Sequence, residues 1–194
     1  MSIGVRRTWD TTAAARTRGV TATIEGLLAS IWFAWARSDA STSMRLWLEI
    51  GGVVALLVAS AGLVLAASRH GRPAQADESA LRRRYNRIVA AEVMLLMAGA
   101  AVLAAIGLSA WIPTWLCAGV GIHFLPASRL FETPFLALIG LTITAASASA
   151  VAAGLTTTFP PSVVAGAGAG ACLLVAALGS LAGGVRAEAR RATH

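Results

Sequence analysis

The sequence contains no lysine, since all 16 of its basic residues are arginine. A Schiff base to retinal or to pyridoxal phosphate requires a lysine amine, so both of these chemistries are excluded. Charge is also scarce: 13% of the 194 residues are charged and 57% are hydrophobic, unlike the mix of a soluble globular domain. The charges gather in short stretches, and the apolar runs between them are long enough to cross a bilayer. The composition therefore predicts an integral membrane protein.

Cysteine is equally rare. Cys117 and Cys172 both lie in apolar runs, whereas structural disulfides of exported domains lie in water-facing loops. We interpret both as small buried hydrophobic residues. No paired cysteines and no Cys/His spacing supply a zinc ligand set, and we expect neither a metal nor another cofactor.

Common catalytic motifs are missing: there is no H-E-x-x-H, no G-x-S-x-G, no phosphate-binding loop and no pair of aspartates within an apolar run. Residues 166–170 (GAGAG) share only composition with a nucleotide loop, because they lie inside an apolar run that no strand precedes. We expect the protein not to be an enzyme. An intramembrane enzyme that acts on lipids is the least favoured alternative, since it rests only on a possible pairing of histidine with glutamate.

Six apolar segments alternate with polar stretches. Their runs of about 20 apolar residues favour helices over the period-2 alternation of a transmembrane β-barrel. The expected spans are residues 20–36, 46–68, 88–110, 114–130, 135–155 and 163–185. Residues 1–19 form a basic leader, too short to fold alone, and residues 186–194 form a basic tail. The predicted fold is all-α, an integral membrane bundle of about six transmembrane helices.

The first segment has two interpretations. Its 17 residues lie at the short limit for crossing a hydrocarbon core of about 30 Å. An arginine-bearing start, a short apolar core and the small-x-small site Ala34-Trp35-Ala36 fit a cleavable signal peptide, which would leave five spans. Glu25 inside the core argues against cleavage, and Trp32 and Trp35 are placed as interfacial anchors. We therefore favour a retained span.

Arginine counts decide whether the short segment 114–130 crosses the bilayer or dips in and returns. Six crossings put the leader, residues 69–87, Arg129 and the tail on one side, which then holds 14 of the 16 arginines. A re-entrant segment would move the C-terminal arginines to the other side. Because positive charge concentrates in cytoplasmic loops, we predict six spans with both termini cytoplasmic, in the plasma membrane, here a bacterial inner membrane.

Five ionisable residues lie in the expected cytoplasmic half of the spans or at its edge: Glu25, Glu92, His123, Arg129 and Glu132. Each costs about 2 to 3 kcal/mol in lipid unless it is paired or near an interface. Glu25 and Glu92 lie about 7 Å in from the cytoplasmic edge, at 1.5 Å per residue. We predict a polar pocket in which the two glutamates accept a proton or cation, and in which Glu92 pairs with His123 or Glu25.

A structural interpretation stands beside this one. Arg129 and Glu132 are spaced i, i+3 and would pair at a helix end. Glu25 and Glu92 would then reach toward lipid headgroups.

His123 is the best single candidate. Gly119 and Gly121 precede it and would let a neighbouring helix approach closely, while Pro126 predicts a bend near Ile122, whose carbonyl loses its usual donor. Together with residues 129–134, the G-x-H-F-x-P segment of residues 121–126 resembles a group of small bacterial polytopic membrane proteins. That group has no assigned activity, so the resemblance implies a membrane protein and adds interest to His123 and Pro126.

The partners follow from charge and from glycine. A net charge of +7 could indicate nucleic acid, but the arginines adjoin apolar spans, so we expect the lipid bilayer and its anionic headgroups as partners and no nucleic acid. Small-xxx-small spacings pair Gly166 with Gly170 and Gly179 with Gly183, which would pack helices within the chain or in a homo-oligomer.

Two functions fit these patterns. The first is a small transporter or permease-like protein with a polar pocket that opens inward. The second is a non-catalytic membrane scaffold or accessory subunit, favoured by the small-residue spacings and the lack of a large soluble domain. A hydrated cavity lined by Glu25, Glu92 and His123 would favour the first, and a dry bundle the second.

Overall fold

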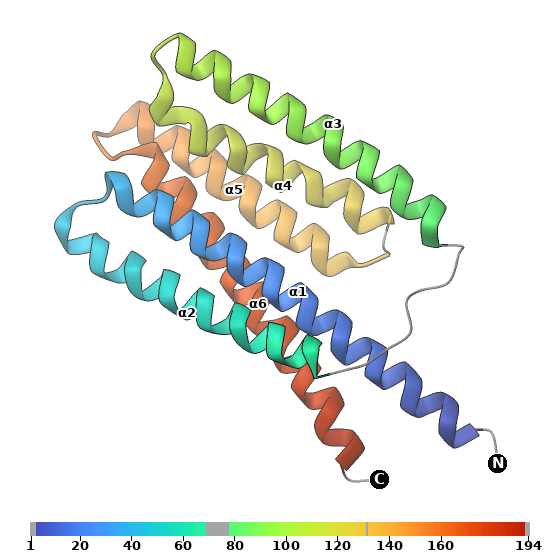
Figure 1. The fold of residues 1–194 in the computed structure, drawn as a ribbon. Coiled ribbons are helices and arrows are strands. Elements are labelled where there is room, and N and C mark those ends of the chain that lie inside the picture. The colour runs from blue at the N-terminus through green and yellow to red at the C-terminus, as the bar shows by residue number, and fades with distance from the viewer. Residues whose placement is uncertain (1–2, 69–77, 131, 193–194) are drawn as a thin grey trace. The chain divides into compact units, whose positions relative to one another are not determined.

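The computed structural model describes residues 3–68, 78–130 and 132–192, and these residues contain helices and no strand. The helices are α1 (Ile3–Asp39), α2 (Thr42–Ala67), α3 (Glu78–Ala105), the short 3-10 helix η1 (Ser109–Trp111), α4 (Ile112–Leu130), α5 (Pro134–Thr156) and α6 (Pro161–Ala192). Figure 1 shows them in chain order. The all-α prediction is confirmed.

Most of these helices can cross a membrane. Among the described residues, five helices are long and apolar enough, and α3 carries a shorter apolar stretch, Val89–Ala105. Large apolar side chains point outward: Trp47, Met94 and Leu155 are each 72% exposed. Exposed apolar surface on this scale fits contact with lipid rather than water. The chain is a multi-pass membrane protein.

Several helices extend beyond the expected spans. Helix α1 begins at Ile3, so the leader expected to be too short to fold is the start of a long helix. Helix α3 begins at Glu78, within the polar stretch 69–87, and α6 continues to Ala192. Alanine and arginine are abundant in these ends and have high helix propensity, so a helix continues through them even where they are polar.

At its C-terminal end, α3 stops before the end of the expected span 88–110. It stops at Ala105 because Gly107 adopts a left-handed conformation with φ of 79°. The Leu108 N–H then donates to the Leu103 carbonyl at 2.8 Å, a hydrogen bond typical of glycine-terminated helices. The chain therefore turns here and enters α4 through η1, and α4 is one continuous helix rather than two short re-entrant ones.

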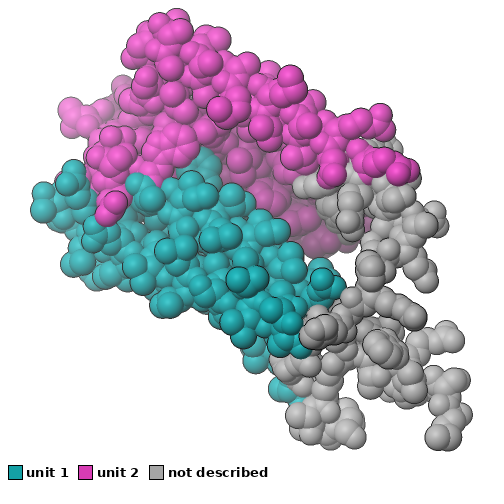
Figure 2. Space-filling model, viewed as in Figure 1, with its two compact units in different colours: residues 1–34, 42–72, 170–194 teal, residues 35–41, 73–169 magenta. Residues whose placement is uncertain are grey.

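The helices form two compact units (Figure 2). Unit 1 comprises residues 1–34, 42–72 and 170–194, and unit 2 comprises residues 35–41 and 73–169. Neither unit is therefore contiguous in sequence. Helices α1 and α6 each contribute to both.

Glycines bring α1 and α2 into close contact in unit 1. A Cβ added at Gly62 would lie 2.7 Å from the Gly19 carbonyl oxygen, and one added at Gly26 would lie 2.7 Å from the Ala55 carbonyl oxygen. The Thr23 hydroxyl bridges the helices by donating to the Ala59 carbonyl at 3.2 Å. Backbones can approach this closely only where side chains are small.

The second half of α6 packs on the same helices. The Phe33 ring lies against Gly51 of α2 and Gly170 of α6. Near the end of the unit, Arg18 donates to the Gly183 carbonyl at 2.6 Å. By contrast, a Cβ added at Gly179 would meet no atom within 4 Å. Gly170 and Gly183 are therefore used for packing within the chain.

In unit 2, α3, α4 and α5 lie side by side (Figure 1). Helices α4 and α5 make a more extensive contact than α3 and α4 do, and a Cβ added at Gly140 would lie 2.7 Å from the Gly121 carbonyl oxygen. Cys117 is fully buried and Cys172 is half-buried, and the two do not form a disulfide. The sequence prediction that Gly121 permits close approach is confirmed.

The ends of α4 and α5 also bear on the sequence predictions. Thr133 is the N-cap of α5, and Pro134 is its first residue. Helix α4 continues through Pro126 to Leu130 without interruption. The bend near Ile122 stays a prediction.

Candidate functional site

Unit 2 brings Glu92 and His123 into direct contact. The Nδ1 atom of His123, on α4, meets the Oε2 atom of Glu92, on α3. The side chains are 16% exposed for His123 and 23% for Glu92. The predicted pairing of these two residues is confirmed.

The packing of α3 against α4 explains why these two residues meet. The turn at Gly107 makes the two helices antiparallel neighbours, and they interlock through large residues set on glycines. The Trp115 ring covers Gly99, and the Leu96 side chain covers Gly119. The indole N–H of Trp115 also donates to the Leu96 carbonyl at 3.0 Å.

Glu92 precedes Leu96 by four residues, and His123 follows Gly119 by four. Four residues are about one helical turn, so the pair is the next contact along the same antiparallel register. Its position is therefore fixed by two glycine contacts that are nearer the turn.

A carboxylate and an imidazole in contact form a site for proton exchange. Histidine is the side chain best suited to gain or lose a proton near neutral pH. A single charge of either sign within the membrane is costly, and an opposite charge in contact with it reduces that cost. The contact therefore lowers the cost of holding these two polar groups in the apolar part of the helices.

Glu25 lies elsewhere, in unit 1. It is 8% exposed and accepts a hydrogen bond of 2.9 Å from the Ser180 hydroxyl of α6. It belongs to a different unit from Glu92 and His123. The candidate residues therefore fall into two sites, a glutamate with a serine and a glutamate with a histidine.

Ser180 was missed by the sequence reasoning. A signal for it exists: Ser180 lies six residues before Arg186, and Glu25 lies six residues after Gly19, so both are at similar distances from the polar ends of their helices. A hydroxyl in a Gly/Ala-rich helix at the depth of a buried carboxylate is a natural donor.

Arg129 and Glu132 are exposed, and in the described part of the chain neither side chain has a hydrogen bond or ion pair with Glu92 or His123. No ion pair between Arg129 and Glu132 is found among the described residues. Helix α4 ends at Leu130, and Glu132 has a φ of 50°. Because the chain has already left the helix, a spacing of three residues no longer places the two side chains on one face.

The chain matches no known protein family, no curated protein and no solved structure. The chemistry of its own residues is therefore what indicates its function.

Proposed function

We propose that this multi-pass membrane protein is a small transporter or permease-like protein in which Glu92 and His123 bind a proton or a cation. The observation that carries the proposal is their contact between two antiparallel helices of unit 2. A stable bundle has no need of a titratable pair at this place, where leucine would pack without the cost of burying charge. Polar pairs inside a membrane commonly mark proton or ion pathways.

The surroundings of the pair support this function. Helix α3 contacts α4 much less extensively than α5 does, so the pair lies at a weaker interface of α4 than the one with α5. Pro126 follows His123 by three residues and removes one backbone hydrogen-bond donor from that part of α4. Displacement of α3 relative to α4 would open the pair to a ligand while the α4 and α5 contact holds.

Proton binding can be measured without knowing the transported substrate. Protein reconstituted in vesicles on a solid-supported membrane is expected to give a transient current after a pH jump, because a proton enters a site inside the membrane. Glu92→Gln should abolish this current, since glutamine keeps the size of the side chain and loses its titration. The control is Glu49→Gln, which changes an exposed glutamate of α2 and should leave the current intact.

Two results would contradict the proposal. One is a vesicle preparation of the unaltered protein that gives no current above that of empty vesicles. The other is a current of full size in Glu92→Gln. Either would favour the scaffold or accessory subunit.

We further propose that both termini face the cytoplasm and that the membrane is the bacterial inner membrane. The support is the arginine distribution, with 14 of 16 on one side of a six-span arrangement. In a cysteine-free variant, a single cysteine at position 41 should react with an impermeant maleimide from outside, and one at position 75 only after permeabilisation. The reverse pattern would overturn this orientation.

The same arginines are proposed to contact anionic lipid headgroups. A homo-oligomer through Gly166, Gly170, Gly179 and Gly183 stays a prediction. Gly179 fits it best, because the space above it is open.

A further inference from the structure

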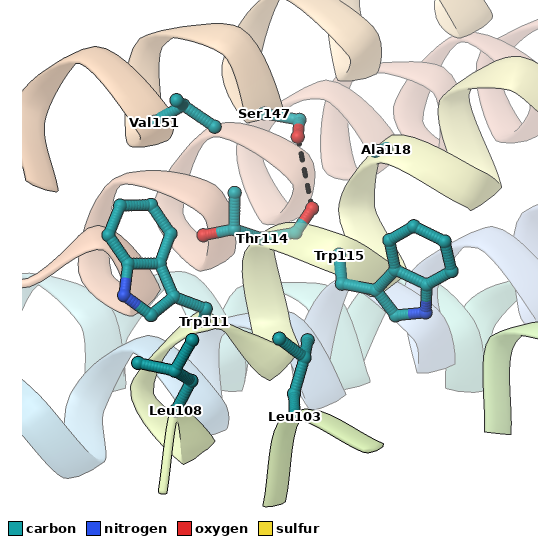
Figure 3. A pocket seen from close by; sticks show the side chains of 8 residues that line it. All are labelled: Leu103, Leu108, Trp111, Thr114, Trp115, Ala118, Ser147 and Val151. Atoms are coloured by element: carbon teal, nitrogen blue, oxygen red, sulfur yellow. Dashed lines mark hydrogen bonds between the residues drawn. The ribbon is translucent and has the colours of Figure 1, made fainter. Parts of the chain in front are cut away.

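A cavity lies in unit 2 near the turn between α3 and α4. Its volume is about 310 Å³, and apolar side chains of α3, η1, α4 and α5 line most of it. Figure 3 shows Trp111 and Trp115 on either side of Thr114, with Leu103 and Leu108 below. Thr114 precedes His123 by nine residues of α4, about 13 Å along the helix, so this cavity is separate from the Glu92 and His123 site.

One polar group in this cavity has no partner. Thr114 is 4% exposed, and its hydroxyl oxygen is the buried side-chain atom that makes no hydrogen bond among the described residues. In Figure 3 this oxygen points to the side on which Trp111 lies, away from Ser147. Buried hydroxyls almost always have a hydrogen-bond partner. The unpaired Thr114 hydroxyl therefore indicates that a bound molecule provides this partner.

The start of α4 explains why Thr114 is unpaired. Threonines within helices commonly donate to the carbonyl four residues earlier, and Thr21, Thr142 and Thr144 do so at 2.8 to 3.0 Å. For Thr114 that carbonyl belongs to Ala110 of η1, where the backbone follows 3-10 rather than α-helical geometry. The hydroxyl is thereby left without the usual acceptor.

Ser147 does not provide a hydrogen-bond acceptor for the Thr114 hydroxyl either. Its hydroxyl donates to the backbone carbonyl of Thr114 at 3.0 Å, a bond drawn in Figure 3. This bond fixes α5 against α4 at the floor of the cavity. The Thr114 hydroxyl therefore needs a hydrogen-bond acceptor from a ligand whose remaining surface is apolar.

We propose that the cavity binds one acyl chain of a membrane phospholipid and that the Thr114 hydroxyl donates to its ester carbonyl. The volume lies at the lower end of the range for ligand sites, about 300 to 1,000 Å³, which suits one chain. The rim residues Leu108, Trp115 and Val151 are 44%, 37% and 38% exposed, so the opening is apolar.

The depth of Thr114 favours an ester over other acceptors. It lies within about 8 Å of the start of the apolar segment Ser109–Leu130, at 1.5 Å per residue. Tryptophans such as Trp111 and Trp115 are enriched where the hydrocarbon core meets the headgroups. The ester groups of phospholipids lie at that level, and their carbonyl oxygens accept hydrogen bonds.

The test compares lipids with and without that carbonyl. The full chain is placed in nanodiscs of ether-linked phosphatidylcholine. A trace of a photoreactive phosphatidylcholine is added, whose labelled hydrocarbon chain is attached either through an ester or through an ether. Mass spectrometry then locates the label. We expect the ester-linked probe to label the cavity peptides about two- to tenfold more than the ether-linked probe, as one net hydrogen bond would give.

Thr114→Val should remove this preference, because valine has the same shape and no hydroxyl. The matched control is Thr142→Val, an exposed threonine whose hydroxyl is already bonded to the Leu138 carbonyl; the preference should persist there. Ala118→Phe should fill the cavity and suppress labelling by both probes, whereas Ala148→Phe, at an exposed position of α5, should not.

Equal labelling by the two probes in the unaltered protein would overturn the proposal, because a water molecule bound to Thr114 would satisfy the hydroxyl in both lipids. A preference that survives Thr114→Val would overturn it as well. Neither result depends on transport or on the Glu92 and His123 pair.

Discussion

Replacing His123 with leucine is expected to destabilise the protein by about 2 to 3 kcal/mol. The substitution leaves the Glu92 carboxylate in the apolar part of α3 without the imidazole that it contacts. Removal of one partner of a buried pair costs about 3 to 5 kcal/mol, and the partial exposure of both side chains places the expected loss below that range. Thermal unfolding can be followed with a thiol-reactive fluorophore, because Cys117 is fully buried until the protein opens.

The double variant Glu92→Leu/His123→Leu is the control. It removes both polar groups, so it should recover most of the lost stability or exceed the original value. If the two single substitutions proved additive, the side chains would not be coupled and the contact would contribute nothing. A stable double variant that also kept the pH-jump current would show that the pair is a structural remnant.

Gly62→Ala is expected to destabilise unit 1 by about 2 kcal/mol, in the range for an added group in a tightly packed contact. The new methyl would lie 2.7 Å from the Gly19 carbonyl oxygen and 2.9 Å from the Thr23 nitrogen. Both are backbone atoms, so relief requires α1 and α2 to move apart, which also lengthens the hydrogen bond from Thr23 to Ala59. The same thermal unfolding measurement reports the loss.

Gly179→Ala is the matched control for this substitution, in another helix of the same unit. No atom lies within 4 Å of the added methyl, and alanine is favoured over glycine within a helix by about 1 kcal/mol. This variant should therefore be unchanged or slightly more stable. A loss of stability in Gly179→Ala as large as that in Gly62→Ala would mean that the α1 and α2 contact is not the cause.

The sequence predicted the structural features that depend on the position of a residue along the bilayer normal. Long apolar runs indicate which part of a helix lies in the membrane, and arginines mark the edges of that apolar part, so helices over all six segments were expected. Depth also placed Glu92 and His123 at one level on consecutive helices. Since a short turn makes such helices antiparallel neighbours, two polar residues at one level had few other partners.

Rotation of a helix about its axis and the choice of neighbours were harder to predict. The sequence predicts a similar depth for Glu25 and Glu92. The side chain of Glu25 faces Ser180 of α6, and hydropathy does not specify in which direction around the helix axis a side chain points. The glycine contact of α1 with α2 was missed, although Ala55 with Ala59 and Gly62 with Ala66 repeat small residues at a spacing of four.

Backbone geometry at helix ends also escaped prediction. The span 88–110 contained Gly107, but glycine is common within membrane helices, so its left-handed conformation could not be distinguished from an ordinary packing glycine. The unpaired Thr114 hydroxyl was equally hard to predict, because it depends on the 3-10 turn that precedes α4. The role of Arg129 and Glu132 in a polar pocket stays a prediction.

The interleaved composition of the two units sets an order of assembly during synthesis. Apart from a short piece of α1, unit 2 is contiguous in sequence, so its contacts form between residues that emerge close together. Unit 1 instead joins α1 to residues 170–194, and its hydrogen bonds from Ser180 to Glu25 and from Arg18 to Gly183 span 155 and 165 residues. Contacts of such separation form late, because the chain between them must be ordered or held first. Until α6 has been translated and has left the ribosome, the Glu25 carboxylate is therefore without the Ser180 hydroxyl from which it accepts a hydrogen bond in the folded chain.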